Sequence, residues 1–273
     1  MKEAYLEIAI IAALKAGNDI LKIYNDPQSD FEIERKADNS PLTIADKTAH
    51  KTIISYLSQT PFPILSEEGQ NIPYQERKNW ETLWIVDPLD GTKEFIKRNG
   101  EFTVNIALIN NGTPILGVIY IPVKKSLYFS TETIGSYKIT GIEYKENFDW
   151  PSIRAQGEKL PFSNKHKNTI IVASRSHLST ETESFIENIK KQNKNIEIIS
   201  SGSSIKICLV AEGTADIYPR FAPTMEWDTA AGHAIAKGAG KEIYQAGEND
   251  PLIYNKENLL NPWFIVEQNR IKI

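Results

Sequence analysis

The 273-residue sequence has one cysteine, no long hydrophobic run and no excess of positive charge. The single cysteine, Cys208, excludes an intramolecular disulfide and favours a reducing compartment. The longest early apolar run, residues 8–14, is followed by Lys15 and Asp19, so it is too short to span a membrane. It also lacks the cationic start and the cleavage site of a signal peptide. We therefore expect a cytoplasmic protein without a membrane span.

The net charge limits the classes of molecule that the protein can bind. The formal net charge is −4, which argues against nucleic acid as a general partner because nothing neutralises a polyphosphate backbone. A small anionic substrate remains compatible, provided that cations are concentrated at its site. Apolar residues make up 41% of the chain and charged residues 24%, which is typical of a globular protein. The length allows one large domain or two modest ones, and nothing indicates an oligomeric state.

In the first half of the chain, apolar spacing and turn residues predict two helices and an antiparallel sheet. A helix is expected over residues 2–24, where apolar residues recur at helical spacing. Residues 31–35 alternate as in a strand, and a second helix begins at Thr43, with Asp46 at the acidic position of a capping box. The strongest hairpin signal is Asn-Asn-Gly at residues 110–112, and the remaining predicted strands are residues 64–66, 102–109, 115–120, 127–130 and 137–139.

The second half of the chain has a different order of predicted helices and strands. Residues 141–167 are polar and weakly periodic, and they contain Pro151 and Pro161. We therefore expect an irregular segment that separates the two halves of the chain, and we call it the seam. Beyond it, strands alternate with helices, which is an α/β pattern. The expected subdomains are therefore residues 1–165 and residues 166–273. The elements predicted after the seam are strands at residues 169–173, 196–199 and 215–218 and helices at residues 180–191, 204–212 and 228–237.

The most informative stretch is residues 84–95 (Trp-Ile-Val-Asp-Pro-Leu-Asp-Gly-Thr-Lys-Glu-Phe). A short apolar run predicts a buried strand that stops at Asp87, because Pro88 has no N–H to donate to a ladder. Asp90 and the following glycine are turn residues, and Thr92 suits the N-cap of a helix. The segment therefore predicts a strand, a tight turn and a helix start, with two carboxylates close together.

Two carboxylates that share a small volume repel each other unless a cation lies between them. No cysteine or histidine lies near Asp87 and Asp90, so the ligands are hard oxygens, which suit Mg²⁺ or Mn²⁺ rather than zinc. Backbone N–H groups at the helix start would suit a phosphate. The alternative is that Asp87 only ends a strand and that Asp90 only forms a turn. Asp46 and Asp228 can likewise be interpreted as capping acids and nothing more.

Several motifs in other parts of the chain combine with this stretch. Together they resemble the lithium-sensitive, magnesium-dependent phosphatases of the inositol monophosphatase superfamily, and the resemblance covers nearly the whole chain except the seam. Within that superfamily, the chain looks most like the 3'(2'),5'-bisphosphate nucleotidases. The motifs are residues 43–46 (Thr-Ile-Ala-Asp), 66–68 (Ser-Glu-Glu), 87–95, 99–103 (Asn-Gly-Glu-Phe-Thr), 174–177 (Ser-Arg-Ser-His), 226–232 (Glu-Trp-Asp-Thr-Ala-Ala-Gly) and 254–262.

The resemblance implies a metal site with two or three Mg²⁺ ions. One would be held by Glu67, Asp87 and the backbone carbonyl of Leu89, and a second by Asp87, Asp90 and Asp228. Four carboxylates carry about −4 and two Mg²⁺ ions about +4, which leaves no surplus for a phosphate dianion. Either a third, weaker cation joins near Glu67 or basic side chains complete the site.

The resemblance also implies roles in catalysis and substrate binding. Water would attack a phosphate ester in line, with Asp46, Thr92 and Glu67 as catalytic residues. Gly91 and Thr92 would offer N–H groups to the phosphate. The remaining candidates for contact with the substrate are Ser174, Arg175, His177, Lys206, Arg220 and Asp228, of which Lys206 and Arg220 are candidate ligands of a second phosphate.

The implied fold is a layered α-β-α-β-α sugar-phosphatase fold, of mixed α+β and α/β character, with the site between the two halves. The implied reaction is hydrolysis of the 3'-phosphate of adenosine 3',5'-bisphosphate to AMP and phosphate, which clears a by-product of sulfate assimilation. One alternative is an inositol monophosphatase or a fructose-1,6-bisphosphatase-like enzyme, against which residues 93–95 and 174–177 speak. Another is a catalytically idle nucleotide-binding module, which would be expected to lack an acidic ligand, whereas none is missing here.

Overall fold

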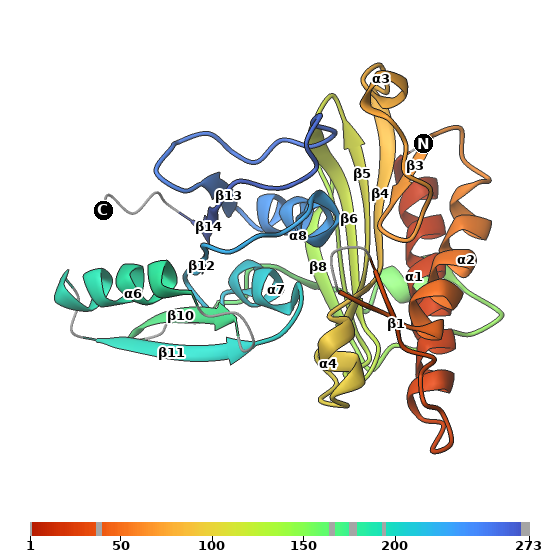
Figure 1. The fold of residues 1–273 in the computed structure, drawn as a ribbon, viewed down its shortest axis with the longest axis horizontal. Coiled ribbons are helices and arrows are strands. Elements are labelled where there is room, and N and C mark those ends of the chain that lie inside the picture. Colours follow the sequence, from red (N-terminus) through yellow and green to blue (C-terminus); the bar gives the residue numbers. More distant parts are fainter. Residues whose placement is uncertain (1, 37–39, 164–166, 175–178, 193–194, 269–273) are drawn as a thin grey trace.

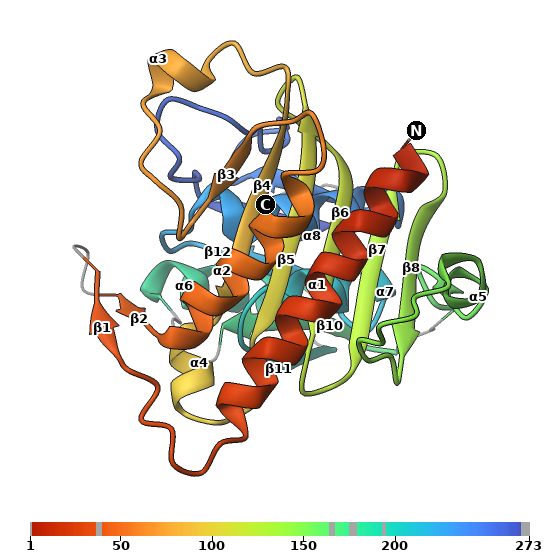
Figure 2. The same ribbon diagram turned by 90° about the vertical axis from the view of Figure 1, so that its right-hand side faces the viewer.

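Two N-terminal helices cover one face of a large sheet. Helices α1 (Lys2–Tyr24) and α2 (Ile44–Leu57) confirm the two predicted helices and lie side by side across that face (Figure 2). Leu6, Ile10 and Ile53 are among the buried apolar side chains that these helices pack against the sheet. The computed structural model describes residues 2–36, 40–163, 167–174, 179–192 and 195–268.

The large sheet has seven strands in the order β3-β4-β5-β6-β7-β8-β9. Neighbouring strands are antiparallel except β3 and β4, which are parallel. The predicted hairpin is confirmed, since Asn111 and Gly112 have φ angles of 47° and 74°, the left-handed conformation that a tight hairpin turn needs. The strands are β3 (Ile64–Ser66), β4 (Thr82–Asp90), β5 (Thr103–Asn110), β6 (Thr113–Ile121), β7 (Ser126–Thr131), β8 (Gly135–Thr140) and β9 (Glu158–Lys159).

Two helices from the second half of the chain, α7 (Ile205–Glu212) and α8 (Glu226–Gly238), form the next layer (Figure 1). Helix α8 packs against the middle strands of the large sheet and approaches β6 at Gly117. A Cβ atom on Gly117 would lie 2.3 Å from the carbonyl oxygen of Ala231. Only glycine permits this approach, so the backbone of β6 sets the depth at which α8 lies.

The remaining strands form smaller sheets beyond α7 and α8, and α6 (Thr180–Gln192) packs against them from outside (Figure 1). Strands β10 and β11 are parallel, and β12-β14-β13 form an antiparallel sheet. The structure therefore confirms the layered α-β-α-β-α fold. The division of the chain near residue 165 stays a prediction. The strands are β10 (Thr169–Ser174), β11 (Ile196–Ser201), β12 (Tyr218–Arg220), β13 (Glu242–Gln245) and β14 (Phe264–Glu267).

The strand predicted at residues 31–35 is largely wrong. Phe31 and Glu32 have φ angles of 64° and 47°, which no strand residue adopts. Their N–H groups donate to the side chains of Ser29 and Asp30, so side-chain hydrogen bonds form a turn in place of a ladder. Only β1 (Glu34–Arg35) is extended, and it pairs with β2 (Pro41–Leu42).

The predicted seam is more regular than expected, and one strand lies later than predicted. The seam contains α5 (Trp150–Arg154) and β9, which pairs with β8. Trp150 is buried edge-on against Phe129 of β7, which explains how a weakly periodic segment is fixed. The strand expected at residues 215–218 is observed at β12, and Ile217 forms only an isolated bridge. In the part of the chain described, no helix has both the length and the apolarity needed to cross a bilayer.

Candidate functional site

Strand β4 positions two carboxylates through a bulge. The strand was expected to stop at Asp87, but it continues through Pro88 to Asp90. Asp87 lies opposite Asn105 of β5 and Asp90 opposite Thr103, so β4 carries one extra residue between the two pairs. In a regular strand, residues three apart point to opposite faces of the sheet. The extra residue brings both carboxylates to one face, and a proline is tolerated at a bulge because one ladder bond is missing there.

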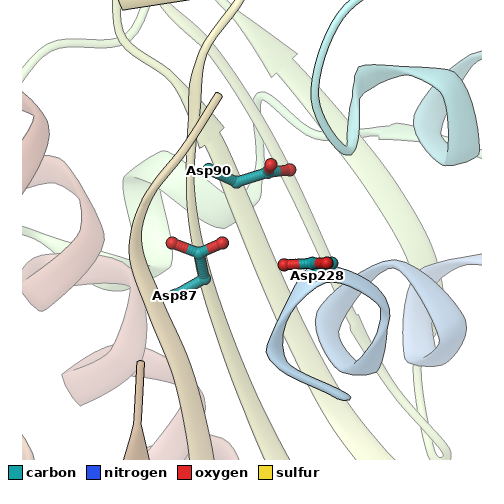
Figure 3. A group of neighbouring side chains, drawn as sticks. All are labelled: Asp87, Asp90 and Asp228. Atoms are coloured by element: carbon teal, nitrogen blue, oxygen red, sulfur yellow. The ribbon is translucent and has the colours of Figure 1, made fainter. Parts of the chain in front are cut away.

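A third carboxylate comes from the first turn of α8. Ligand oxygens of Asp87, Asp90 and Asp228 all lie within 4.8 Å of one another. Figure 3 shows the three side chains directed into one space, two from β4 and one from the helix. Asp228 Oδ2 also accepts the N–H of Met225 at 2.8 Å. The capping and the metal-ligand interpretations of Asp228 are therefore compatible, because a carboxylate has two oxygens.

Asp90 and Asp87 are each held in place through one carboxylate oxygen. Asp90 Oδ2 accepts the N–H of Ser204 at 2.6 Å and the hydroxyl of Ser203 at 2.8 Å. Asp87 Oδ1 accepts the N–H of Leu89 at 3.1 Å. These bonds fix both side chains before any cation is present, which is how a preorganised ligand set is built.

The electrostatics of the cluster fit a divalent cation. Burial raises the pKa of Asp87 well above its ordinary value, and the charges of Glu67, Asp90 and Asp228 raise it further. Burial and the charges of Asp90 and Glu67 also raise the pKa of Asp228. A cation among these oxygens would remove the mutual repulsion. Hard carboxylate oxygens, with no sulfur or nitrogen among them, fit Mg²⁺, Mn²⁺ or Ca²⁺.

Glu67 follows β3 directly and lies next to the cluster. Its N–H donates to the carbonyl of Val86 at 3.1 Å, and its charge is among the causes that raise the pKa of Asp87. Burial raises the pKa of Glu67, and the ammonium group of Lys36 opposes this shift. Glu67 thus lies where the sequence predicted a ligand, although it does not belong to the group of three oxygens described above.

Lys36 is the residue that the sequence did not reveal. Its Nζ lies 2.7 Å from Glu67 Oε1 and 2.5 Å from Glu68 Oε1. Burial lowers the pKa of Lys36, but the two carboxylates outweigh it and raise the pKa above its ordinary value. The charge count predicted either a third cation near Glu67 or basic side chains that complete the site, and nothing else in the sequence indicated Lys36.

The predicted pair of Asp46 and Thr92 is brought together. Thr92 was expected at the N-cap of a helix, but that position belongs to Gly91, whose φ is 94°, and Thr92 is the first residue of α4 (Thr92–Ile96). The Thr92 hydroxyl lies 3.1 Å from Asp46 Oδ1, the nearer of its two acceptors, and 3.3 Å from the carbonyl oxygen of Leu89. Asp46 is 1% exposed, and burial raises its pKa to about 6. Its other oxygen accepts the N–H of Thr43 at 2.7 Å, so the predicted capping box is also confirmed.

A cavity of about 430 Å³ lies beside the carboxylates. This volume is typical of a site for a small molecule. The cavity brings together residues of both halves of the chain. Of the predicted site residues, Glu67, Asp90, Gly91, Thr92, Ser174, Lys206, Arg220 and Asp228 line it.

Three basic residues line the same cavity, Lys93, Lys206 and Arg220, and two of them are predicted site residues. Lys206 is 4% exposed, its Nζ donates to the carbonyl of Ser203 at 2.6 Å, and burial lowers its pKa to about 8. Arg220 donates from Nη2 to the carbonyl of Pro223 at 3.1 Å. Its Nε atom is buried and has no acceptor within the described residues. Ser174 ends β10 at the cavity, whereas Arg175 and His177 lie outside the described residues.

Comparisons with known proteins give a consistent result. The model of the inositol monophosphatase family matches residues 1–271. The 3'(2'),5'-bisphosphate nucleotidase CysQ of Escherichia coli strain K12 is 43% identical over 257 residues, which cover 93% of this chain and 96% of that protein. The protein of the same name from Salmonella typhimurium is 43% identical over 264 residues and covers 96% and 98%. The crystal structure of CysQ from Bacteroides thetaiotaomicron, a bacterial member of the inositol monophosphatase family, has a TM-score of 0.92, 62% identity and 98% coverage of both chains.

Proposed function

The chain belongs to the inositol monophosphatase family, and we propose that it removes the 3'-phosphate of adenosine 3',5'-bisphosphate to give AMP and phosphate. The reaction is that of a phosphoric monoester hydrolase, a 3'(2'),5'-bisphosphate nucleotidase. One observation carries the choice of substrate. Asp90 and Asp228, two of the three clustered carboxylates, line a cavity together with Lys206 and Arg220, so the site offers a place for a metal-bound phosphate and separate cations for a second phosphate.

The metal ions of this proposal are Mg²⁺, two or three in number, with Mn²⁺ as a substitute. Glu67, Asp87 and the Leu89 carbonyl would hold one ion, and Asp87, Asp90 and Asp228 another. The clustering and the raised pKa values of Asp87 and Asp228 support this assignment. When bound, the cations neutralise phosphate charge and lower the pKa of a water molecule.

The chain itself supplies proton transfer and positioning. The Thr92 hydroxyl donates to Asp46, so its lone pair can accept a proton from the attacking water while Asp46 takes the hydroxyl proton. Glu67 lines the same cavity and is assigned a role in orienting the same water. N–H groups of Gly91 and Thr92 are assigned to the phosphate that is cleaved.

The second phosphate is assigned to basic groups on the far strands and helix. Lys206 and Arg220 line the cavity, and their positive charges support this assignment. Ser174, at the end of β10, is assigned to the same phosphate or to the ribose. Arg175 and His177 are proposed substrate contacts on the strength of the family motif alone, and Asp228 is proposed to meet the substrate as well as a metal ion.

The wider setting follows from the same proposal. The substrate site lies between residues 1–165 and residues 166–273, which are proposed as two subdomains. The enzyme works on a small nucleotide, not on nucleic acid, and clears a by-product of sulfate assimilation. A cytoplasmic location is supported by the single cysteine, Cys208, which is buried and unpaired.

The test is phosphate release by the purified chain with Mg²⁺, from adenosine 3',5'-bisphosphate, inositol 1-phosphate and fructose 1,6-bisphosphate in parallel, with and without lithium. Strong preference for the nucleotide together with lithium inhibition is expected. Preference for inositol phosphate would retain the metal chemistry and overturn the substrate. Absence of release from all three would favour the idle binding module.

A further inference from the structure

A segment near the C-terminal end of the described chain, residues 254–261, contacts the first turn of α8, which carries Asp228. We call it the tail segment. The N–H of Glu226, the first residue of α8, donates to the carbonyl of Leu259 at 3.0 Å, and the N–H of Asn261 donates to the carbonyl of Thr224 at 2.8 Å. The Asn261 amide also donates to the carbonyl of Met225 at 2.7 Å. The backbone before Asp228 is therefore hydrogen-bonded to the tail segment on two sides.

Glu226 is a charged side chain with no exposed surface. Its carboxylate accepts the N–H of Asn255 at 2.6 Å, the N–H of Lys256 at 3.0 Å and the Lys256 ammonium at 2.6 Å. A buried carboxylate is stable only when donors surround it in this way. Glu226 stands two residues before Asp228, so its three bonds fix the start of the helix that carries the ligand.

Arg77 connects the same tail segment to the part of the chain that leads into β4. It ends α3 (Tyr74–Arg77), shortly before β4, and it is 2% exposed. Its guanidinium group donates to the side chain of Asn255 at 3.0 Å and to the carbonyls of Lys256 and Glu257 at 2.5 and 2.8 Å. The Asn255 amide donates back to the Arg77 carbonyl at 2.8 Å.

These contacts form one continuous path. It runs from Arg77, in the helix that precedes β4 in the chain, through the tail segment to Glu226, two residues before Asp228. Packing of α8 against the sheet is mostly apolar and therefore largely non-directional. Directional contacts are made by the Ser136 hydroxyl of β8, which donates to the carbonyl of Ile235 at 2.6 Å, and by the Ser204 hydroxyl, which donates to the carbonyl of Asp228 at 2.9 Å. The hydrogen bonds that the planar guanidinium group of Arg77 donates are directional and fix the tail segment, which in turn holds Glu226 at the start of α8.

We propose that Arg77, Glu226, Asn255 and Lys256 act as a clamp that sets the position of Asp228 relative to Asp87 and Asp90, so that Arg77 and Asn255 are positioning residues for the metal ions. The inference rests on the proposed function, in which these three carboxylates hold the ions. Mg²⁺ requires near-octahedral geometry at about 2.0–2.1 Å, so a small shift of one ligand weakens binding. Loss of groups that orient ligands typically costs about 10- to 100-fold in metal affinity.

The experiment measures Mg²⁺ binding directly, by titration calorimetry on the full chain, beside thermal unfolding without metal. Arg77→Met removes the guanidinium group, and Arg77→Lys retains the charge. Asn255→Gly is the second variant, since Asn255 has a φ of 64° that glycine tolerates. We expect Mg²⁺ affinity to fall about tenfold or more in Arg77→Met and Asn255→Gly. Partial recovery is expected in Arg77→Lys.

Lys138→Met is the matched control. Lys138 of β8 forms an ion pair with Glu212 of α7 at 2.6 Å, so it also joins the large sheet to a helix of the second half, but it contacts no residue of the clamp. The control should lower the unfolding temperature and leave Mg²⁺ affinity unchanged. If Arg77→Met and Asn255→Gly behave as the control does, the clamp is merely structural and the inference is wrong. If the wild-type chain binds no Mg²⁺, the proposed metal site and the inference both fail. If the wild type binds Mg²⁺ and the two variants bind it with the same affinity, only the inference is overturned.

Discussion

The hydroxyl oxygen of Thr92 lies 3.1 Å from Asp46 Oδ1, although one residue begins α4 and the other lies in the first turn of α2. Asp46 Oδ2 accepts both the N–H and the hydroxyl of Thr43, at 2.7 and 2.5 Å. The carboxylate is thus held by one oxygen and presents the other to Thr92. A base that is fixed and buried in this way is suited to proton transfer at a defined atom.

Thr92→Val should lower kcat by about 100-fold or more, because it removes the hydroxyl group and keeps the shape of the side chain. Thr92→Ser should retain most of the activity. The check is phosphate release from adenosine 3',5'-bisphosphate at saturating Mg²⁺, with thermal unfolding to show that both variants fold. Equal kcat values for the valine variant and the wild type would remove Thr92 from the mechanism.

Asp90→Asn should abolish most turnover and leave the fold intact. The amide oxygen of asparagine can accept the bonds from Ser203 and Ser204, which leaves the NH₂ group facing the cation site. A lost metal ligand costs several kcal/mol of barrier, and each ~1.4 kcal/mol is about tenfold in rate. Since the Asp90 charge raises the pKa values of Asp87 and Asp228, the metal-free variant should melt no lower than the wild type. Near-wild-type activity would contradict the metal assignment.

The lowered pKa of Lys206 predicts that kcat/KM for the nucleotide depends on pH. Burial lowers its pKa to about 8, so its charge is present below pH 8 and lost above it in the free enzyme. The kcat/KM for the nucleotide should therefore fall as pH rises through about 8. Lys206→Met should have a lower kcat/KM at pH 7 and lack this step. The same slope in both proteins would show that another group titrates.

The same shift has a consequence for stability. The folded-state pKa of Lys206 lies below the unfolded value, so between about pH 8 and the ordinary lysine pKa the unfolded chain binds more protons. This lysine therefore contributes stability that increases with pH across that window. Urea unfolding of the wild type and Lys206→Met at pH 7 and pH 10 checks the sign, since the advantage of the methionine variant should shrink at pH 10.

Gly117→Ala should destabilise the protein, by about 1–3 kcal/mol, because the new Cβ would overlap the carbonyl oxygen of Ala231 in α8. The helix can only move away from β6, which also displaces Asp228, so Mg²⁺ affinity should fall with stability. Urea unfolding measures the first effect and calorimetry the second. Gly157→Ala is the control, since its nearest neighbour lies at 3.1 Å, where a small adjustment relieves the contact. If Gly117→Ala has the same free energy of unfolding as the wild type, α8 can move away from β6 without loss of stability.

Local chemistry was the part that the sequence could predict. The hairpin at Asn111–Gly112 and the capping box of Thr43 and Asp46 depend on residues within a few positions of each other, and both were confirmed. The clustering of Asp87 and Asp90 was also predicted, but for a partly wrong reason. Pro88 was expected to end the strand, whereas the sheet accommodates it in a bulge. Whether Pro88 ends the strand or lies in a bulge depends on the pairing with the neighbouring strand, and local sequence patterns carry no information about that pairing.

Long-range pairs were not predictable. Lys36 lies in an irregular segment and forms an ion pair with Glu67, and Arg77 forms a hydrogen bond with Asn255, 178 residues later in the sequence. No periodicity or turn signal relates such positions, because tertiary packing alone brings them together. The strand expected at residues 31–35 is largely absent for a different reason. Alternating residues favoured it, but the N–H groups of Phe31 and Glu32 donate to the side chains of Ser29 and Asp30 and stabilise a turn instead.

The layer formed by α7 and α8 also constrains how the protein is made. The last strand of the large sheet ends at Lys159, whereas α8 ends at Gly238, so the sheet is synthesised well before the helices that cover its second face. At ~5–20 residues per second, the interval is on the order of ten seconds. During that time Leu83, Ile85 and Ile109, which later pack with α7 and α8, have no cover from the same chain. A nascent chain in that state carries an open apolar sheet, and its escape from aggregation depends on how soon the ribosome releases α8.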